Sequence, residues 1–212
     1  MEVALDILKA VLIAAGSYVL GSVSLSIFLS KRLFGGDVRA HGSGNAGATN
    51  MARVYGMMAG VLTLAADMVK AAVSMIGGYL LLGDLGLAIG GAGCILGHCF
   101  PVLHHFRGGK GVSVGGMLAL LLDWRVGLLV IGFFLLGALL SKKVSLGSIC
   151  GAVACGVGSL LLVSSVPRVV LGVFAMVVVV ARHKENIGRL IKGTEPDFKP
   201  AKRKAKAQPE QQ

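Results

Sequence analysis

Long apolar stretches separated by short polar breaks occupy most of the chain. They run over about residues 5–30, 54–82, 86–104, 112–122, 126–141, 145–164 and 168–182. A helix that crosses a bilayer needs about 20 apolar residues, a length that most of these stretches approach. The stretches 112–122 and 126–141 are short, and they form either two short helices or one broken hairpin. The pattern predicts an all-α, polytopic membrane bundle of seven transmembrane helices, with five as the lower bound.

Composition supports the membrane assignment. The mean hydropathy is +0.79, 55% of the residues are hydrophobic and 15% are charged, whereas soluble domains are about 45–50% apolar. The first stretch follows Glu2 and Asp6 rather than a basic segment, and no cleavage site of small residues comes after it. We therefore expect it to be retained as a spanning helix and not removed as a signal peptide.

The distribution of charge predicts the orientation. Of the 21 Lys and Arg residues, all except Lys9, Lys70, Arg125 and Arg168 fall on one side of a seven-helix arrangement. The positive-inside rule then places the N-terminus outside and the C-terminus in the cytoplasm. Such loops account for most of the net charge of +11, so the basic composition does not indicate binding to nucleic acid.

The C-terminal end differs from the rest of the chain. Residues 196–212 are rich in Pro, Lys, Ala and Gln and have no apolar period. This predicts a disordered, basic cytoplasmic tail after a membrane-embedded domain over residues 1–195. The basic run 202–206 favours anionic lipid headgroups, and a solvated segment that only retains the topology is the alternative.

Three polar clusters interrupt the apolar pattern on the predicted cytoplasmic side. The first covers residues 42–50 and is followed by Arg53. Its glycines permit tight turns in which backbone N–H groups converge on an anion, and Thr49 or Asn50 is expected to cap the next helix. A helix N-terminus attracts phosphate, and Arg53 can bind phosphate through two parallel hydrogen bonds. A plain glycine-rich connector is the alternative.

The other two clusters have a similar character. Residues 108–111 offer free amides and the Lys110 ammonium, but they are not a nucleotide P-loop, because His104 stands where that motif requires glycine. A plain basic turn is the alternative. In the third cluster, His183 and Asn186 share a helix face and Arg189 follows one turn later; capping and interfacial snorkelling are the alternative.

The remaining titratable side chains give weaker indications of function. Asp67 and Lys70 lie three residues apart inside an apolar stretch, and we expect them to form a structural pair. The four cysteines also lie in apolar stretches, and no nucleotide, flavin or metal motif is present, so we expect neither a cofactor nor a metal. No histidine is followed five residues later by aspartate, which excludes the His-x4-Asp pattern of acyltransferases with thioester donors.

Taken together, residues 42–53, 97–111 and 182–195 resemble one family, the bacterial glycerol-3-phosphate acyltransferases that take their acyl group from acyl phosphate. The order and spacing of the motifs also match, and the resemblance covers about residues 10–195. One departure lies after Gly21-Ser22, where family members often have proline and this chain has Val23-Ser24.

The resemblance implies an enzyme of the bacterial inner (cytoplasmic) membrane whose active site faces the cytoplasm. It would transfer an acyl group from acyl phosphate to the 1-hydroxyl of sn-glycerol 3-phosphate. The products would be lysophosphatidate (1-acylglycerol 3-phosphate) and inorganic phosphate, in the first step of phospholipid synthesis. Acyl phosphate is already activated, so the site must mainly hold two anions, orient them and accept a proton.

The resemblance also implies roles for individual residues. The catalytic group would be Ser43, Arg53, Lys110, His183 and Asn186. Substrate and phosphate binding would involve Gly42, Gly44, Asn45, Gly47, Thr49, Asn50, Gly108, Gly109, Gly111 and Arg189. The base would be either the phosphate of the substrate itself or His183.

Two other classes of protein, a transporter and a structural scaffold, would explain part of these features. A small membrane transporter for a phosphorylated solute would explain the clusters, but the internal repeats expected of it are not evident. A structural scaffold would explain the bundle and not the clusters. As partners we expect both substrates and membrane lipids, no nucleic acid, a monomeric chain, and association with the enzyme that produces acyl phosphate.

Overall fold

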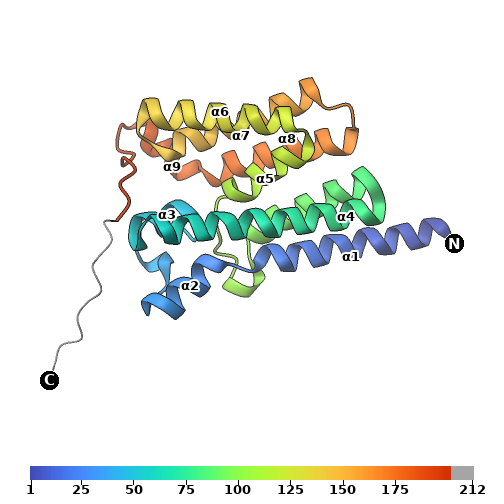
Figure 1. Ribbon diagram of the computed structural model, residues 1–212, viewed down its shortest axis with the longest axis horizontal. Coiled ribbons are helices and arrows are strands. Elements are labelled where there is room, and N and C mark those ends of the chain that lie inside the picture. The colour runs from blue at the N-terminus through green and yellow to red at the C-terminus, as the bar shows by residue number, and fades with distance from the viewer. Residues whose placement is uncertain (202–212) are drawn as a thin grey trace.

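The computed structural model describes residues 1–201, and all regular secondary structure in this range is helical. The helices are α1 (Glu2–Ser22), α2 (Leu25–Phe34), η1 (Val38–Ala40), α3 (Ala48–Tyr55), α4 (Met57–Cys99), η2 (Val102–His104), α5 (Val112–Leu122), α6 (Trp124–Ser141), α7 (Val144–Leu162), α8 (Val166–Arg182) and α9 (Lys184–Ile191). Figure 1 shows the long helices lying side by side, with α2, α3 and α9 together at the end opposite the N-terminus. The prediction of an all-α fold is confirmed.

The first apolar stretch forms two helices instead of the single helix predicted over 5–30. α1 ends at Ser22 and α2 begins at Leu25, with Val23 extended between them. The carbonyl oxygens of Gly21 and Val23 accept hydrogen bonds from the Lys70 ammonium, each at 2.9 Å. An ammonium that satisfies carbonyls freed at a helix end explains why the chain breaks here without a proline.

α4 doubles back on itself between the predicted stretches 54–82 and 86–104. Leu82 and Gly83 leave the helical conformation, and Gly83 adopts a positive φ of 56°. The two arms then pack backbone to backbone, because a Cβ atom on Gly78 or Gly86 would lie 2.1 or 2.0 Å from the carbonyl oxygen of the other glycine. Only glycine permits this approach.

The number of membrane crossings stays a prediction. In the described part of the chain, four segments are long and apolar enough to cross a bilayer, or five if α8 and α9, bent by 59°, form one span. In this count α4 is one segment, although its two arms run in opposite directions. α5 is too short to cross a bilayer by itself, because its 11 residues rise about 16 Å. The predicted orientation likewise stays a prediction.

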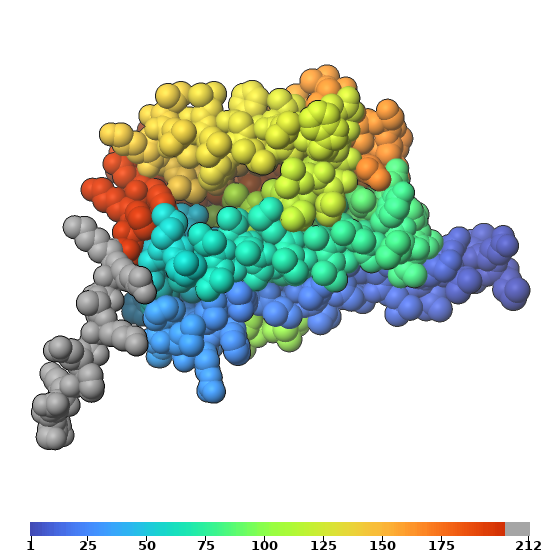
Figure 2. All heavy atoms as spheres, viewed as in Figure 1, coloured from blue at the N-terminus to red at the C-terminus, as the bar shows by residue number. Residues whose placement is uncertain are grey.

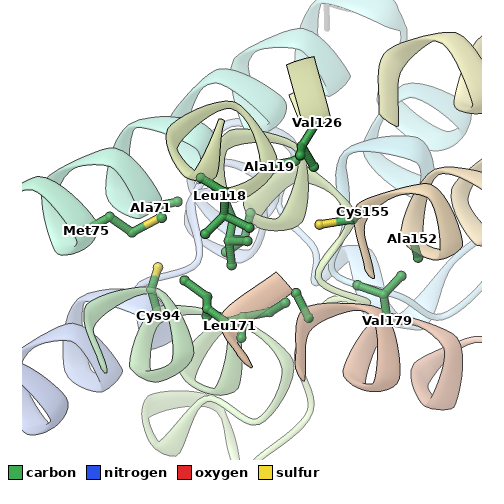
Figure 3. Packing of buried hydrophobic residues seen from close by; sticks show 14 of the residues in the cluster. Ala71, Met75, Cys94, Leu118, Ala119, Val126, Ala152, Cys155, Leu171 and Val179 are labelled. Carbon is green, nitrogen blue, oxygen red and sulfur yellow. The ribbon is translucent and has the colours of Figure 1, made fainter. Parts of the chain in front are cut away.

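The apolar core lies where the arms of α4 meet α5, α7 and α8. Figure 3 shows Met75 and Cys94 from the two arms of α4 facing Leu118 and Leu171. On the outer faces, large apolar side chains are exposed instead, among them Leu140 on α6 at 79%. Exposed apolar faces around a packed core fit a protein surrounded by lipid.

The start of the predicted tail lies against the body of the protein. The Phe198 N–H donates to the Lys142 carbonyl at 3.0 Å, and Asp197 pairs with Lys143 at 3.0 Å. The basic run 202–206 belongs to residues 202–212, which lie outside the described part of the chain. A domain boundary after residue 195 and a lipid-binding tail therefore stay predictions.

Candidate active site

The first polar cluster folds around the side chain of Asn50. This amide is 1% exposed; its oxygen accepts from the Ser43 N–H at 2.9 Å. Its nitrogen donates to the carbonyls of Val38, His41 and Asn45 at 2.9–3.1 Å. Asn50 therefore shapes the loop that precedes α3 through an amide whose nitrogen and oxygen are both engaged, and its contact with phosphate stays a prediction.

Glycine is required at one point of this loop. Gly42 has a φ of 61°, and a Cβ atom there would lie 2.3 Å from the Asn50 side-chain oxygen. Both the conformation and the close approach exclude a larger residue. The loop then enters α3 through Gly47, which is the N-cap residue and has no side chain to occupy the free N–H groups. Those N–H groups remain available to an anion.

The second cluster packs against the end of α4. A Cβ atom on Gly108 would lie 2.0 Å from the His98 carbonyl oxygen, and one on Gly109 would lie 2.0 Å from Nε2 of the His98 ring. Arg182 donates to the Gly109 carbonyl at 3.2 and 3.3 Å, which links this loop to α8. The glycines thus let the loop lie directly on α4. This packing role is separate from the phosphate binding that the sequence predicted for them.

Arg39 connects the first two clusters. Its guanidinium donates to the carbonyls of His104 and Arg107, both at 3.0 Å, and it pairs with Asp37 at 2.8 Å. The Asp37 pKa is lowered to about 2, chiefly by the hydrogen bond from Arg39. An ionised Asp37 keeps Arg39 in place, so the two glycine-rich loops are held together by a fixed cation.

The third cluster presents a neutral histidine. The His183 Nδ1 lies 2.7 Å from the Val179 carbonyl, and since a carbonyl only accepts, Nδ1 carries the proton. Burial lowers the pKa of His183 below its usual value, with further lowering by Lys110 and Arg182, although the Val179 hydrogen bond opposes it. Nε2 is therefore a hydrogen-bond acceptor at neutral pH.

A chain of polar contacts links the second cluster to the third. The Lys110 ammonium donates to the side-chain oxygen of Asn186. The Asn186 nitrogen donates to Glu195 at 2.7 Å, and the other Glu195 oxygen accepts from Arg189 at 2.6 Å. Burial alone would raise the pKa of Glu195, but the polar groups of Ser145, Asn186 and Arg189 lower it, so Glu195 is ionised and Arg189 is partly neutralised.

All three clusters line one cavity of about 400 Å³, the central cavity. A wider hollow of about 1020 Å³, the outer hollow, shares Ser43, Asn45 and Lys110 with it. The predicted site residues on the central cavity are Ser43, Asn45, Gly47, Thr49, Asn50, Arg53, Lys110, His183, Asn186 and Arg189. Gly44 and Gly108 line the outer hollow, whereas Gly42, which is exposed, and the buried Gly109 and Gly111 line neither surface.

One side of the central cavity is apolar and reaches the flank of the bundle. Val61 and Leu64 on α4 face Phe134 and Ala138 on α6 across it. Figure 2 shows a cleft between these two helices, with the later part of the chain visible at its back. The site therefore combines cations and free amides at one end with an apolar slot that opens sideways.

Sequence reasoning missed several residues of this region. His98 also lines the central cavity, as do Ser145 and Glu195, while Arg39 and Arg182 line the outer hollow. Glu195 and Arg182 fall in the third stretch that carried the family resemblance, which was the signal available for them. Within residues 1–201, no group of three or more His, Cys, Asp or Glu residues is placed to hold a metal ion.

Comparison with known proteins decides the family. The model of the family described as "Glycerol-3-phosphate acyltransferase" matches residues 11–193. The chain belongs to the glycerol-3-phosphate acyltransferase family. The predicted resemblance is thereby confirmed.

Individual relatives agree over almost the whole chain. The glycerol-3-phosphate acyltransferase of Finegoldia magna is 34% identical, with 90% of this chain and 97% of that protein covered. The acyltransferase of Syntrophotalea carbinolica is 39% identical, with 86% and 94% covered. No feature of these full-length matches favours the transporter alternative.

Two solved structures share the fold. Both are of PlsY (YgiH), an integral membrane glycerol 3-phosphate acyltransferase. Its glycerol 3-phosphate form is 31% identical with a TM-score of 0.85, and 90% of this chain and 96% of that chain are covered. Its lysophosphatidic acid form is 29% identical with a TM-score of 0.82, and 90% and 95% are covered. The acyltransferase described here is therefore an integral membrane protein, as its hydropathy predicted.

Proposed function

We propose that this acyltransferase transfers an acyl group directly from acyl phosphate to the 1-hydroxyl of sn-glycerol 3-phosphate. The observation that carries the proposal is the meeting of three distant polar clusters on one cavity whose remaining wall is apolar. PlsY structures in glycerol 3-phosphate and lysophosphatidic acid forms support the acceptor and the product. The identity of the donor rests on the chemistry of the site.

Glycerol 3-phosphate would bind between the first and second clusters. Arg53 lines the central cavity from the last turn of α3, where its planar guanidinium can meet a phosphate dianion. Ser43 and the Lys110 ammonium lie on the same wall. A fork-shaped cation, a point charge and a hydroxyl are groups that bind phosphate well.

The acyl phosphate would place its phosphate on the loop amides and its chain in the apolar slot. The N–H groups at the start of α3 and those of residues 108–111 supply donors, and Asn186 and Arg189 lie nearby. The slot between α4 and α6 offers an apolar surface that opens to the side. A chain that enters from lipid through this slot keeps its apolar part out of water.

The transfer itself requires no covalent enzyme intermediate. The glycerol hydroxyl oxygen attacks the carbonyl carbon of the acyl phosphate, a new C–O ester bond forms, and the C–O bond to phosphate breaks as phosphate leaves with the electron pair. His183 accepts the hydroxyl hydrogen bond through Nε2, which orients the attacking lone pair toward the carbonyl. The proton passes to His183 or to a substrate phosphate, the two acceptors within reach of such a site.

The remaining features of the proposal concern location. We place the enzyme in the bacterial inner membrane as a monomer, with the cavity open to the cytoplasm, on the strength of the positive-inside distribution of charge. Acyl phosphate is an unstable mixed anhydride, so association with the enzyme that produces it would protect the donor from hydrolysis.

The test uses purified protein in detergent. Wild-type protein with palmitoyl phosphate and glycerol 3-phosphate should release inorganic phosphate in equal amount to a product with the mass of 1-palmitoylglycerol 3-phosphate. Omission of glycerol 3-phosphate should abolish both signals. Phosphate release without an acylated product would identify a phosphatase and contradict the proposal.

A further inference from the structure

A buried charge cluster lies beside the site and takes no part in the roles assigned above. Asp67 and Lys70 pair at 2.9 Å on the first arm of α4, as the sequence predicted. His98 at the end of the second arm joins them, with its Nδ1 3.1 Å from the Lys70 ammonium and 3.3 Å from Asp67. The three residues are only 3–7% exposed. The cluster therefore joins two antiparallel arms by charge.

The charges in this cluster fix the tautomer of His98. Asp67 and Lys70 cancel, so the cluster is neutral only if the imidazole is neutral, which is the state least costly to bury. The other groups facing Lys70 are the carbonyls of Gly21 and Val23, which carry no charge. Asp67 lies 3.3 Å from Nδ1 of His98, but the hydrogen bond of this nitrogen is with Lys70. An ammonium can only donate, so Nδ1 accepts and the ring proton lies on Nε2.

The protonated nitrogen is placed at the substrate cavity. His98 lines the central cavity together with Ser43 and Lys110. Nε2 lies against Gly109, where a Cβ atom would come within 2.0 Å of it. Within residues 1–201 this nitrogen has no hydrogen-bond partner, and it is not among the fully enclosed polar atoms. His98 thus brings an N–H donor without a partner to the edge of a cavity whose other polar groups suit phosphate.

The burial of this charge cluster costs more free energy than apolar contacts between the two arms of α4 would. One Asp67 oxygen is buried with no hydrogen-bond partner in the described chain. Ionised side chains within a membrane-embedded core cost free energy, and they commonly mark functional sites. Replacement of such a pair by apolar residues is often neutral or stabilising, so packing alone does not explain the cluster.

We propose that His98 is a substrate-binding residue whose Nε2–H donates to a phosphoryl oxygen in the central cavity, and that Asp67 and Lys70 are positioning residues which fix its tautomer. The proposal deepens the acyltransferase function and rests on it. His98 acts as a neutral donor in this scheme, in contrast to His183, whose Nε2 accepts. The two histidines therefore present opposite hydrogen-bonding groups to the two substrates.

The experiment compares variants of the full chain in detergent with palmitoyl phosphate and glycerol 3-phosphate. His98→Gln keeps an N–H donor of similar reach, whereas His98→Phe keeps a planar ring without one. Asp67→Asn removes the counter-charge that orients the ring. Asp84→Asn is the matched control. Asp84 lies on α4, as Asp67 does, but it pairs with Arg168 of α8 at 2.7 Å and does not line the cavity.

We expect His98→Phe to lower kcat/KM by about 10- to 100-fold, the cost of a hydrogen bond to a charged group. His98→Gln should recover much of this loss. Asp67→Asn should lower kcat/KM of the folded protein as well as Tm, and Asp84→Asn should leave kcat/KM unchanged. Equal kcat/KM for His98→Phe, His98→Gln and wild type would overturn the proposal.

A measurement on wild-type protein decides the matter even if His98→Phe does not fold. In ¹⁵N-histidine-labelled protein, the His98 ring signals are those that disappear in His98→Gln. Inorganic phosphate should shift the protonated Nε2 signal, and an unchanged signal at saturating phosphate would overturn the proposal. Absence of acyl transfer by wild-type protein would contradict the proposed function, and the phosphate titration would still decide the role of His98.

Discussion

The Lys110 ammonium donates a hydrogen bond to the side-chain oxygen of Asn186, although 76 positions separate the two residues in the chain. The same amide donates to Glu195, which in turn pairs with Arg189. The neutral side chain of Asn186 thus links Lys110 to Glu195, and Glu195 in turn holds Arg189. A cation fixed before the substrate arrives needs little reorganisation when charge develops in the transition state.

Loss of the central amide should disturb the whole arrangement. In Asn186→Ala, Lys110 loses its acceptor and Glu195 loses a donor, so we expect kcat/KM to fall about 10- to 100-fold and Tm to decrease. Steady-state kinetics and thermal unfolding of the purified variant measure both. Unchanged kcat/KM would show that the contact has no part in catalysis.

The pH dependence of activity should report on Lys110. Burial, followed by the charges of Arg189 and Arg182, lowers the pKa of Lys110 below its ordinary 10.5, and Glu195 and Glu185 only partly oppose this. As the pH rises, Lys110 should lose its proton, and kcat/KM for glycerol 3-phosphate should fall at a pH below 10.5. Lys110→Arg should move this fall to higher pH, because a guanidinium stays charged. If kcat/KM of Lys110→Arg fell at the same pH as that of wild type, the fall would belong to another group and the prediction would be contradicted.

Arg53 should be needed as a guanidinium and not only as a charge. We expect Arg53→Ala to lose about 2–4 kcal/mol of transition-state binding, or about 30- to 1,000-fold in kcat/KM. Arg53→Lys should remain impaired, since an ammonium cannot make the paired hydrogen bonds. Arg125→Gln is the control, because Arg125 pairs with Asp123 and lies away from the cavity. Near-normal kcat/KM in Arg53→Ala would make the first loop a plain connector.

The orientation of the bundle is open to direct measurement. The charge asymmetry predicts that a cysteine added at the N-terminus reacts with an impermeant thiol reagent from outside the cell and not from the cytoplasmic side. The native cysteines Cys94, Cys99 and Cys155 are buried and should contribute little background. Labelling from the cytoplasmic side alone would reverse the topology and move the cavity to the outer face.

The helices could be predicted from the chain because hydropathy is local. Each apolar stretch after the first corresponds to a helix or to one arm of α4, and the gap expected after residue 82 is the reversal at Gly83. The break between α1 and α2 could not be predicted in this way. It depends on Lys70, which reaches Gly21 from 49 positions away.

The site could be predicted in part for a similar reason. Glycines and cations in short clusters indicated phosphate binding, and Arg53, Lys110 and His183 do line one cavity. The sequence could not predict which residues of a cluster bind a ligand and which hold the loop in place, because this depends on contacts made after folding. The side chain of Asn50 holds the loop through hydrogen bonds to distant carbonyls, and His98, which was given no role, reaches the cavity.

The choice of donor tests the account most directly. Wild-type protein should be supplied with glycerol 3-phosphate and palmitoyl phosphate, or, in separate assays free of acyl phosphate, with glycerol 3-phosphate and either palmitoyl-coenzyme A or palmitoyl-acyl carrier protein. We predict that only palmitoyl phosphate supports formation of 1-palmitoylglycerol 3-phosphate, and that Arg53→Ala abolishes most of this turnover. Robust turnover with either thioester alone would contradict the proposed function.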